Sequence, residues 1–244
     1  DIASVAGFQT NACATRPEGS VSCWGSYVDL QNNAPTSTTF EQVDVGNLFA
    51  CALRNDDTLS CWGQATFGKT APPAVSFADF DINEEYGCGL LLDGSIQCWG
   101  YMPDGQSSVP AGTFDAVSTG YHHVCALGET GEPTCWGLNS DGQLTPPLGA
   151  FTQVAAGGLH TCGLRGDGSV ECWGANIYGE ATPPAVEFSD VFAGTNVSCG
   201  VTTEGDVRCW GHRTVLLLGE LDFLWLRRLE LGVFDLGIPL GRVH

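Results

Sequence analysis

The sequence of 244 residues predicts an all-β fold, a single β-propeller built from a repeat of about 37 residues. Three observations support this prediction. Twelve cysteines fall into six pairs of one spacing, and Trp-Gly follows the second member of every pair. Successive pairs are 37 residues apart, with one step of 38. Short runs of Val, Thr and aromatic residues alternate with Gly, Asp and Pro, a pattern typical of strands joined by turns.

The cysteine pairs predict disulfides and an oxidising compartment, because two cysteines per repeat at a fixed spacing form a regular framework. Structural zinc is the alternative, but zinc ligands usually come in close pairs such as Cys-x2-Cys, whereas nine residues separate these partners. No leader segment is recognisable, so we expect the chain to begin at a mature end. The predicted bridges are Cys13/Cys23, Cys51/Cys61, Cys88/Cys98, Cys125/Cys135, Cys162/Cys172 and Cys199/Cys209.

The fifth copy of the repeat shows what one unit builds. Phe151 and the run 154–157 predict a first strand that ends at a glycine turn, and His160–Arg165 predicts a second strand. Gly166-Asp167-Gly168 predicts a hairpin turn, because glycine tolerates the positive φ that such turns need. The chain then returns as a third strand at 169–173. Three to four short strands per repeat are the content of one propeller blade.

The register of this hairpin follows from its turn. With Asp167 at the centre, Cys162 lies opposite Cys172 and Leu164 lies opposite Val170. Opposed residues of an antiparallel pair have Cα atoms about 4.5–5.5 Å apart, which suits a disulfide. A bridge that closes so short a loop contributes roughly 2–3 kcal/mol in the chain-entropy model.

These residues carry a resemblance to a known family. The pattern V-x-A-G-x-x-H-x-C-x-L-x-x-D-G-x-V-x-C-W-G-x-N-x-x-G-Q resembles the regulator of chromosome condensation repeat, in the short bacterial form seen in the second β-lactamase inhibitory protein. The best copies are Val117–Gln143 and Val154–Glu180, and the resemblance covers about residues 1–212. It implies a β-propeller, usually of seven blades, that recognises proteins across one ring face. The paired cysteines depart from the intracellular members and fit a secreted branch.

The pattern stops after Gly211, so we divide the chain into a six-repeat body (1–212) and an atypical Leu-rich tail (213–244). We expect the tail to form a degenerate seventh blade that closes the ring beside six disulfide-bearing blades. The alternatives are six blades with an extra C-terminal segment, or an apolar segment at 214–244 offered to another subunit. The charged residues within 214–231 argue against a membrane span.

The net charge of −19 makes nucleic acid a poor partner, because phosphate binding relies on Lys and Arg and the chain has one lysine, Lys69. An acidic surface suits solubility or a basic partner. The acidic residues form no D-x-D-x-D-G calcium loop, so we predict neither a metal site nor a cofactor, although calcium on an acidic ring stays open. Asn196-Val197-Ser198 is a glycosylation sequon, relevant where the source glycosylates.

Two apparent motifs are set aside. The segment 63–70 matches the phosphate-loop pattern G-x-x-x-x-G-K-T, but it falls at a repeat position that elsewhere holds Gly-Gln or Gly-Glu, so Lys69 replaces a Gln or Glu. His123 and His160 share one repeat position, and other copies place unrelated residues there. We therefore expect packed or hydrogen-bonded histidines rather than ligands. No Ser/His/Asp set can be identified, and we predict no catalytic residues.

The copies differ most in the linker that follows each Trp-Gly, and a binding site is expected there. Rigid aromatic side chains at a ring surface make good hot spots. In the resembling inhibitor, aromatic and acidic side chains of such loops line the binding face. The candidate ligand-binding residues are Tyr27, Phe67, Tyr101, Asp141 and Tyr178.

The sequence therefore favours a secreted, non-catalytic module that binds an extracellular protein or a glycan through loops on one propeller face. A secreted enzyme inhibitor is a narrower version of this hypothesis. A structural subunit of an extracellular filament, sheath or adhesin, which self-associates through residues 214–244, is the alternative from another class. An enzyme would need ionisable groups on the central channel, and most repeat positions expected there are small or apolar.

Overall fold

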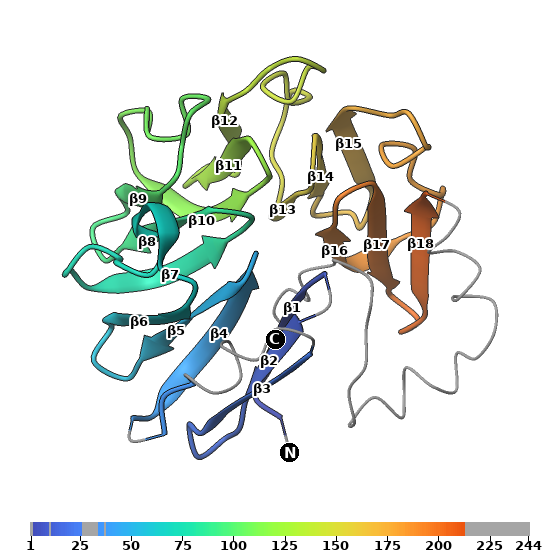
Figure 1. Cartoon of the computed structure of the whole chain (residues 1–244). Helices are drawn as coiled ribbons and strands as arrows, with labels where there is room; N and C mark the ends of the chain where they lie inside the picture. Colours follow the sequence, from blue (N-terminus) through green and yellow to red (C-terminus); the bar gives the residue numbers. More distant parts are fainter. Residues whose placement is uncertain (1, 10, 26–33, 37, 213–244) are drawn as a thin grey trace.

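The computed structural model describes the chain except for residues 1, 10, 26–33, 37 and 213–244. The described residues form an all-β structure of six three-stranded antiparallel sheets and one 3-10 turn, η1 (Thr66–Gly68) (Figure 1). Each sheet holds three consecutive strands, so every repeat folds as one blade, as predicted. The expected seventh blade and the proposed tail contacts lie outside the described residues.

The blades follow the chain in order. Blades 1 to 3 are formed by β1 (Ser4–Phe8), β2 (Asn11–Thr15) and β3 (Val21–Gly25); β4 (Phe40–Gly46), β5 (Phe49–Arg54) and β6 (Leu59–Gly63); and β7 (Phe77–Ile82), β8 (Tyr86–Leu91) and β9 (Ile96–Gly100). Blades 4 to 6 are formed by β10 (Phe114–Thr119), β11 (His123–Gly128) and β12 (Pro133–Gly137); β13 (Gln153–Ala156), β14 (His160–Leu164) and β15 (Val170–Gly174); and β16 (Phe188–Ala193), β17 (Val197–Thr202) and β18 (Val207–Gly211). In the described part of the chain, no helix has the length and apolar character needed to cross a membrane.

The register within each blade places its two cysteines opposite each other on the second and third strands. In blade 5, Cys162 pairs with Cys172 and Leu164 with Val170, which confirms the predicted register. The cysteines of the other five blades are opposed in the same way. The hairpin register read from one repeat therefore holds for all six.

All six predicted disulfides form, each within its own repeat, and no free cysteine is left. Their Cα–Cα distances are 4.0–4.1 Å. They are shorter than the expected separation of about 4.5–5.5 Å and lie nearest its short end, which is the separation of opposed residues in a non-hydrogen-bonded pair. The bridges are Cys13–Cys23, Cys51–Cys61, Cys88–Cys98, Cys125–Cys135, Cys162–Cys172 and Cys199–Cys209.

The two cysteines of each bridge differ in burial, a difference that the sequence did not predict. The first lies on the second strand of its blade and is only 0–4% exposed. The second lies on the third strand, at the outer edge of the sheet, and is half-buried in every blade. These half-buried partners are Cys23, Cys61, Cys98, Cys135, Cys172 and Cys209. Each bridge therefore joins the blade interior to its partly open outer strand.

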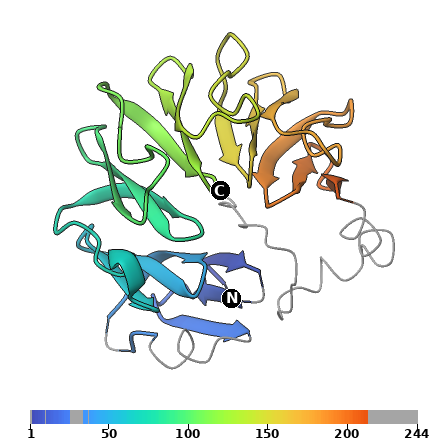
Figure 2. The ribbon, with the colours of Figure 1, turned by 45° about the horizontal axis from the view of Figure 1, so that its top comes forward.

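The six blades succeed one another around a common axis (Figure 2). The first strands of successive blades contact one another, and we call them the inner strands. Side chains on one inner strand bind the backbone of the next. An Asp44 oxygen accepts from the Ile82 N–H at 2.9 Å, and the Ser118 hydroxyl accepts from the Ala156 N–H at 3.0 Å. Hydrogen bonds therefore join neighbouring inner strands around the axis of the ring.

The core lies between blades. At the interface of blades 4 and 5, Phe151, Val154 and Trp173 of blade 5 pack on Cys125 and Leu127 of blade 4. The Trp-Gly tryptophans of blades 2 to 6 are only 5–7% exposed. Three of them donate their indole N–H to the linker carbonyl thirty residues earlier, at 2.7–3.0 Å. These tryptophans are anchors between blades.

Candidate functional site

One face of the ring gathers two kinds of loop. Because the strands of a blade alternate in direction, the loop after the first strand and the end of the third strand lie at the same edge. Backbone hydrogen bonds join them: the Tyr101 N–H donates to the Glu85 carbonyl at 2.9 Å, and the Leu138 N–H donates to the His122 carbonyl at 2.8 Å. We call this edge the loop face. The hairpin turns between second and third strands lie at the opposite edge.

Phe67 and Tyr101 meet on the loop face. They come from the linkers after blades 2 and 3, and their ring centroids are 4.7 Å apart. Phe67 is 64% exposed and Tyr101 is 48% exposed. Phe67 lies within η1 at a φ of 57°, a left-handed conformation that costs a non-glycine residue energy. The fold therefore holds a strained aromatic residue in solvent beside a second exposed ring.

In the linkers after blades 4 and 5, a buried side chain accepts a hydrogen bond from the backbone of the linker tip. Gln143 accepts from the Asp141 N–H at 2.8 Å, and Glu180 accepts from the Tyr178 N–H at 2.7 Å. Both acceptors are buried. These two linkers are therefore held from beneath, and their tip residues are presented at the surface.

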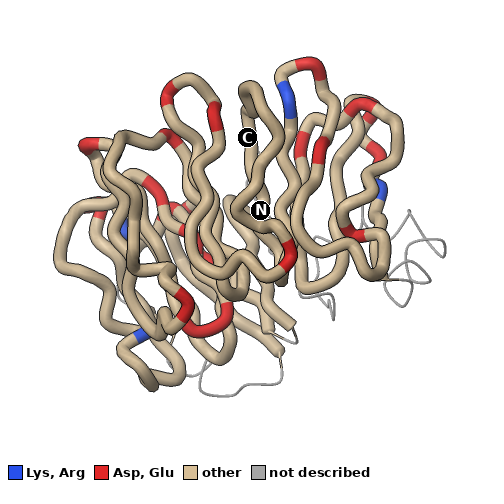
Figure 3. Tube along the Cα trace, turned by 90° about the horizontal axis from the view of Figure 1, so that it is seen from above, with Lys and Arg blue, Asp and Glu red and all other residues tan. Residues whose placement is uncertain are grey.

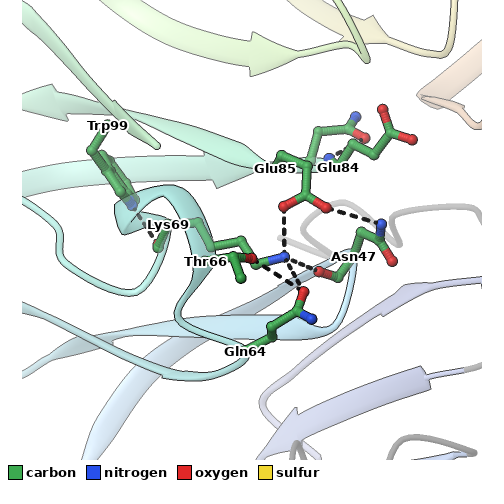
Figure 4. A network of polar contacts seen from close by, with 8 residues as sticks. Asn47, Gln64, Thr66, Lys69, Glu84, Glu85 and Trp99 are labelled. Atoms are coloured by element: carbon green, nitrogen blue, oxygen red, sulfur yellow. Dashed lines mark hydrogen bonds and ion pairs between the residues drawn. The ribbon is translucent and has the colours of Figure 1, made fainter. Parts of the chain in front are cut away.

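Lys69 takes this buried position in blade 2, where it places a positive charge. Its Nζ forms an ion pair with Glu85 at 2.7 Å and donates to the Asn47 carbonyl and to Gln64 Oε1 (Figure 4). The side chain of Lys69 is fully buried. The segment 63–70 leads from strand β6 into η1, so the phosphate-loop match is a coincidence of letters and Lys69 is a linker anchor.

Two other predicted site residues, Tyr178 and Asp141, stand apart from the Phe67–Tyr101 pair. Tyr178 packs edge-on against His212, with centroids 4.7 Å apart. Asp141 is exposed and accepts a hydrogen bond from the Ser140 hydroxyl at 2.6 Å. Tyr27 lies outside the described residues. The structure therefore brings two of the five predicted residues together, and the binding role of all five stays a prediction.

A pocket of about 160 Å³ opens beside Tyr101, between the loops of blades 3 and 4. Sequence reasoning missed most of its residues, because they belong to the loops after β7 and β10 rather than to the Trp-Gly linkers. The only sequence signal was that these loops differ from copy to copy. The pocket is lined by Glu84, Glu85, Tyr86, Tyr101, Pro103, Gln106, Tyr121 and His122.

Tyr121 connects this pocket to the far side of the ring. Its hydroxyl forms a hydrogen bond with Thr195 of blade 6 at 2.5 Å, and its ring lies 5.9 Å from the ring of Phe8 in blade 1. Burial raises the pKa of the Tyr121 hydroxyl above its usual value. This side chain of blade 4 thus contacts blades 1 and 6 on the loop face.

Some charged groups in and around the pocket have a partner of opposite charge, and one does not. Glu85 is held by Lys69, and His122 Nδ1 lies 3.0 Å from Asp104. The Glu84 carboxylate makes no hydrogen bond or ion pair with another described residue. Partial burial raises its pKa, and the nearby Glu85 raises it further, against the opposing effect of His122 and Lys69. Glu84 is therefore the carboxylate of this pocket that lacks a direct partner among the described residues.

The two repeat-equivalent histidines are structural, as expected. His123 Nε2 hydrogen-bonds Thr161 at 2.8 Å and His160 Nε2 hydrogen-bonds Ser198 at 2.7 Å, each across a blade interface. Burial lowers the pKa of His123 to about 3 and that of His160 to about 4. The Ser198 hydroxyl donates to the Glu180 carbonyl, so the neutral His160 ring donates from Nε2. Both rings are buried and unavailable to a ligand.

Asp44 and Asp81 form a carboxyl pair on the inner strands β4 and β7. Burial raises the pKa of both groups, and the charge of Asp81 raises that of Asp44 further. The pair therefore titrates as a unit. Three backbone N–H groups also donate to it, from Val45, Ile82 and Thr119. No group of three His, Cys, Asp or Glu residues that could hold a metal ion occurs among the described residues.

Comparisons with known proteins agree with this architecture. The Regulator of chromosome condensation (RCC1) repeat matches residues 40–69, 114–143 and 151–180. The entire ectodomain of the Physcomitrella patens receptor kinase CR4 superposes with a TM-score of 0.75 at 26% identity, over 85% of this chain and 63% of that one. No match was found among curated proteins.

Two further solved structures show the same fold. The CRINKLY WD40 ectodomain of the Arabidopsis thaliana receptor kinase ACR4 matches with a TM-score of 0.74 at 24% identity, over 85% of this chain and 83% of that one. Prp20p from Saccharomyces cerevisiae matches with a TM-score of 0.71 at 16% identity, over 85% and 71%. Of the Physcomitrella patens ectodomain described above, this chain covers less than two thirds of the length. The resemblance to the β-lactamase inhibitor remains a prediction.

Proposed function

We propose that this chain, an RCC1-like repeat β-propeller, is an extracellular, non-catalytic module that binds a protein partner through its loop face. The observation that carries the proposal is the exposed Phe67–Tyr101 pair. Tyr101 of this pair also lines the pocket that contains Glu84. Six disulfides favour an oxidising compartment. Two of the similar structures are ectodomains of receptor kinases.

The geometry of the pair suits protein recognition. Aromatic side chains dominate binding hot spots, and a surface that is rigid before binding loses less entropy when it binds. Lys69 donates to Gln64 in the linker of Phe67, and Gln106 accepts from the Asp104 N–H in the linker of Tyr101, so both linkers are anchored from beneath. The loop face therefore offers an aromatic contact without a large ordering cost.

The proposal is tested by comparing exposed apolar residues on opposite faces. The double variant Phe67→Ala/Tyr101→Ala removes the aromatic pair, and Leu92→Ala removes an equally exposed side chain (66%) from the opposite hairpin turn. Extracellular proteins captured by the immobilised wild-type protein are identified, and their affinities are then measured with purified components. We expect the double variant to bind at least about 30-fold more weakly and Leu92→Ala to bind like the wild type.

Either of two results would contradict the proposal. A partner that binds the double variant as tightly as the wild-type protein does not use the loop face. A specific glycan ligand on an array, with no protein partner, would assign the face to sugar stacking instead. Equal melting temperatures of the three proteins exclude unfolding as the cause of any loss.

The assembly hypothesis retains one supporting observation. Ile2 of blade 1 is 46% exposed, while the phenylalanines at the same repeat position in blades 2 to 6 are buried. An uncovered apolar blade face can pair with another chain. Under this hypothesis deletion of residues 214–244 abolishes assembly in light scattering. Under the closure hypothesis the same deletion lowers the melting temperature of a monomer.

A further inference from the structure

The pocket beside Tyr101 is small and chemically mixed. Tyr101, Tyr121 and His122 supply ring surfaces, and the buried side chains of Tyr86 and Gln106 close it from within. Its volume of about 160 Å³ equals roughly five water molecules, and small-molecule sites are usually about 300–1,000 Å³. The pocket is therefore sized for one side chain of a partner rather than for a cofactor or nucleotide.

The charge of the pocket selects the kind of side chain. The Glu84 side chain points away from the Lys69–Glu85 ion pair, as Figure 4 shows. Its carboxylate is partly withdrawn from water and has no direct partner among the described residues. A cation placed there gains a charge-assisted hydrogen bond from an acceptor that is already partly desolvated. It also gains attraction from the tyrosine rings, since an aromatic face attracts cations.

We propose that this pocket binds the cationic end of a basic side chain, arginine or lysine, presented by the protein partner. The inference rests on the proposed function, because the basic side chain belongs to that partner. The planar guanidinium of arginine can accept stacking from an aromatic ring and donate two hydrogen bonds to one carboxylate. The Phe67–Tyr101 pair then covers the apolar stem of the bound side chain.

The charge of the whole protein supports this assignment. The net charge is −19, and acidic residues far outnumber basic ones along the described trace (Figure 3). Such a field raises the encounter rate of a basic partner. A metal ion is a poorer occupant, because calcium requires six to eight oxygen ligands and two of the nearby carboxylates, Glu85 and Asp104, are already paired.

The pocket can be tested without the partner. The full chain labelled with 15N is titrated with Nα-acetyl-arginine amide, and the amide signals of Glu85, Tyr101 and His122 are followed by NMR. We expect saturable shifts with a dissociation constant on the order of 1–10 mM, as one side chain alone allows. The citrulline analogue, a neutral isostere of the arginine probe, should give no saturable shift. Glu84→Gln should weaken arginine binding about tenfold.

Glu129→Gln is the matched control, because it removes one exposed carboxylate from the hairpin turn of blade 4 on the opposite face. It should leave the titration unchanged. The inference is overturned if no pocket signal shifts at tens of millimolar probe, if citrulline binds as well as arginine, or if both glutamate variants lose the same affinity. A protein partner that requires Phe67 and Tyr101 but binds Glu84→Gln as tightly as the wild type would support the proposed function. This result would reject only the inference that the pocket binds a basic side chain.

Discussion

The interfaces inside the ring and the faces at its two ends are built from the same repeat but buried to different degrees. The phenylalanine that opens blades 2 to 6 is 0–6% exposed, whereas Ile2 at the same position of blade 1 is 46% exposed. Trp24 is half-buried, while its five equivalents are buried. On blade 6, Val201 is half-buried where Leu164 of blade 5 is buried. A blade therefore owes its buried core to its neighbours more than to its own sequence.

The largest expected effect separates an interior tryptophan from the terminal one. Trp136→Ala removes a side chain packed between blades 3 and 4 and should cost about 3–5 kcal/mol of unfolding free energy. Trp24→Ala removes a half-buried side chain and should cost about 1–2 kcal/mol. Guanidinium unfolding followed by circular dichroism measures both values.

Equal losses in the two variants would break the comparison. They would mean that something covers the blade 1 face in solution, either residues 213–244 or another copy of the chain. Light scattering of the wild-type protein then decides between the two, because only the second occupant doubles the mass.

Loss of a disulfide should lower the unfolding free energy equally in an interior blade and in a terminal blade. Every bridge joins residues ten apart, so each closes a loop of the same length. Replacing Cys125/Cys135 or Cys13/Cys23 by alanine pairs should therefore cost similar amounts, about 2–3 kcal/mol. Peptide mapping of the unreduced protein provides the check on connectivity. Bridges between different repeats, or free thiols, would contradict the blade register itself.

The sequence predicted the parts of this structure that recur. The period and the hairpin register of Cys162 and Cys172 follow from signals written six times, so each copy supports the others. Lys69 was correctly placed at the Gln/Glu position of the linker, but its partner Glu85 was not foreseen. The partner lies sixteen residues away in the next blade, and no repeat-equivalent pair exists to reveal it.

The candidate site was predicted less completely, for a physical reason. Its residues occur once each and meet only through the geometry of adjacent blades. Tyr101 was identified because it is aromatic and lies in a variable linker. Glu84, Tyr121 and His122 belong to loops near the axis, where a side chain can contact several blades, as Tyr121 does. The buried carboxyls of Asp44 and Asp81 were missed because other copies place small or apolar residues at their position.

The most gradual expected effect concerns the histidines that cross interior interfaces, because it develops only as the pH falls. An unfolded histidine has a pKa of about 6.5, whereas burial holds the pKa of His123 near 3 and that of His160 near 4. Well above pH 6.5 both states are neutral, and neither histidine changes stability with pH. As pH falls below 6.5, the two histidines bind protons in the unfolded chain but not in the folded chain. Each histidine then removes up to about 1.4 kcal/mol of stability per pH unit until its folded pKa is reached.

His123→Gln isolates one of these contributions, because glutamine can still donate to Thr161 and does not titrate. Unfolding free energies between pH 7 and pH 4.5 should fall less steeply in this variant than in the wild-type protein. The Asp44–Asp81 pair acts with the opposite sign, since its raised pKa makes folding more favourable as pH falls, but it contributes equally to both proteins and cancels in the difference. An unchanged slope would mean that His123 accepts a proton without unfolding. The blade 4–5 interface would then be as open to water as the outer faces of blades 1 and 6. The contrast between buried interior interfaces and exposed terminal faces would then be wrong at this interface.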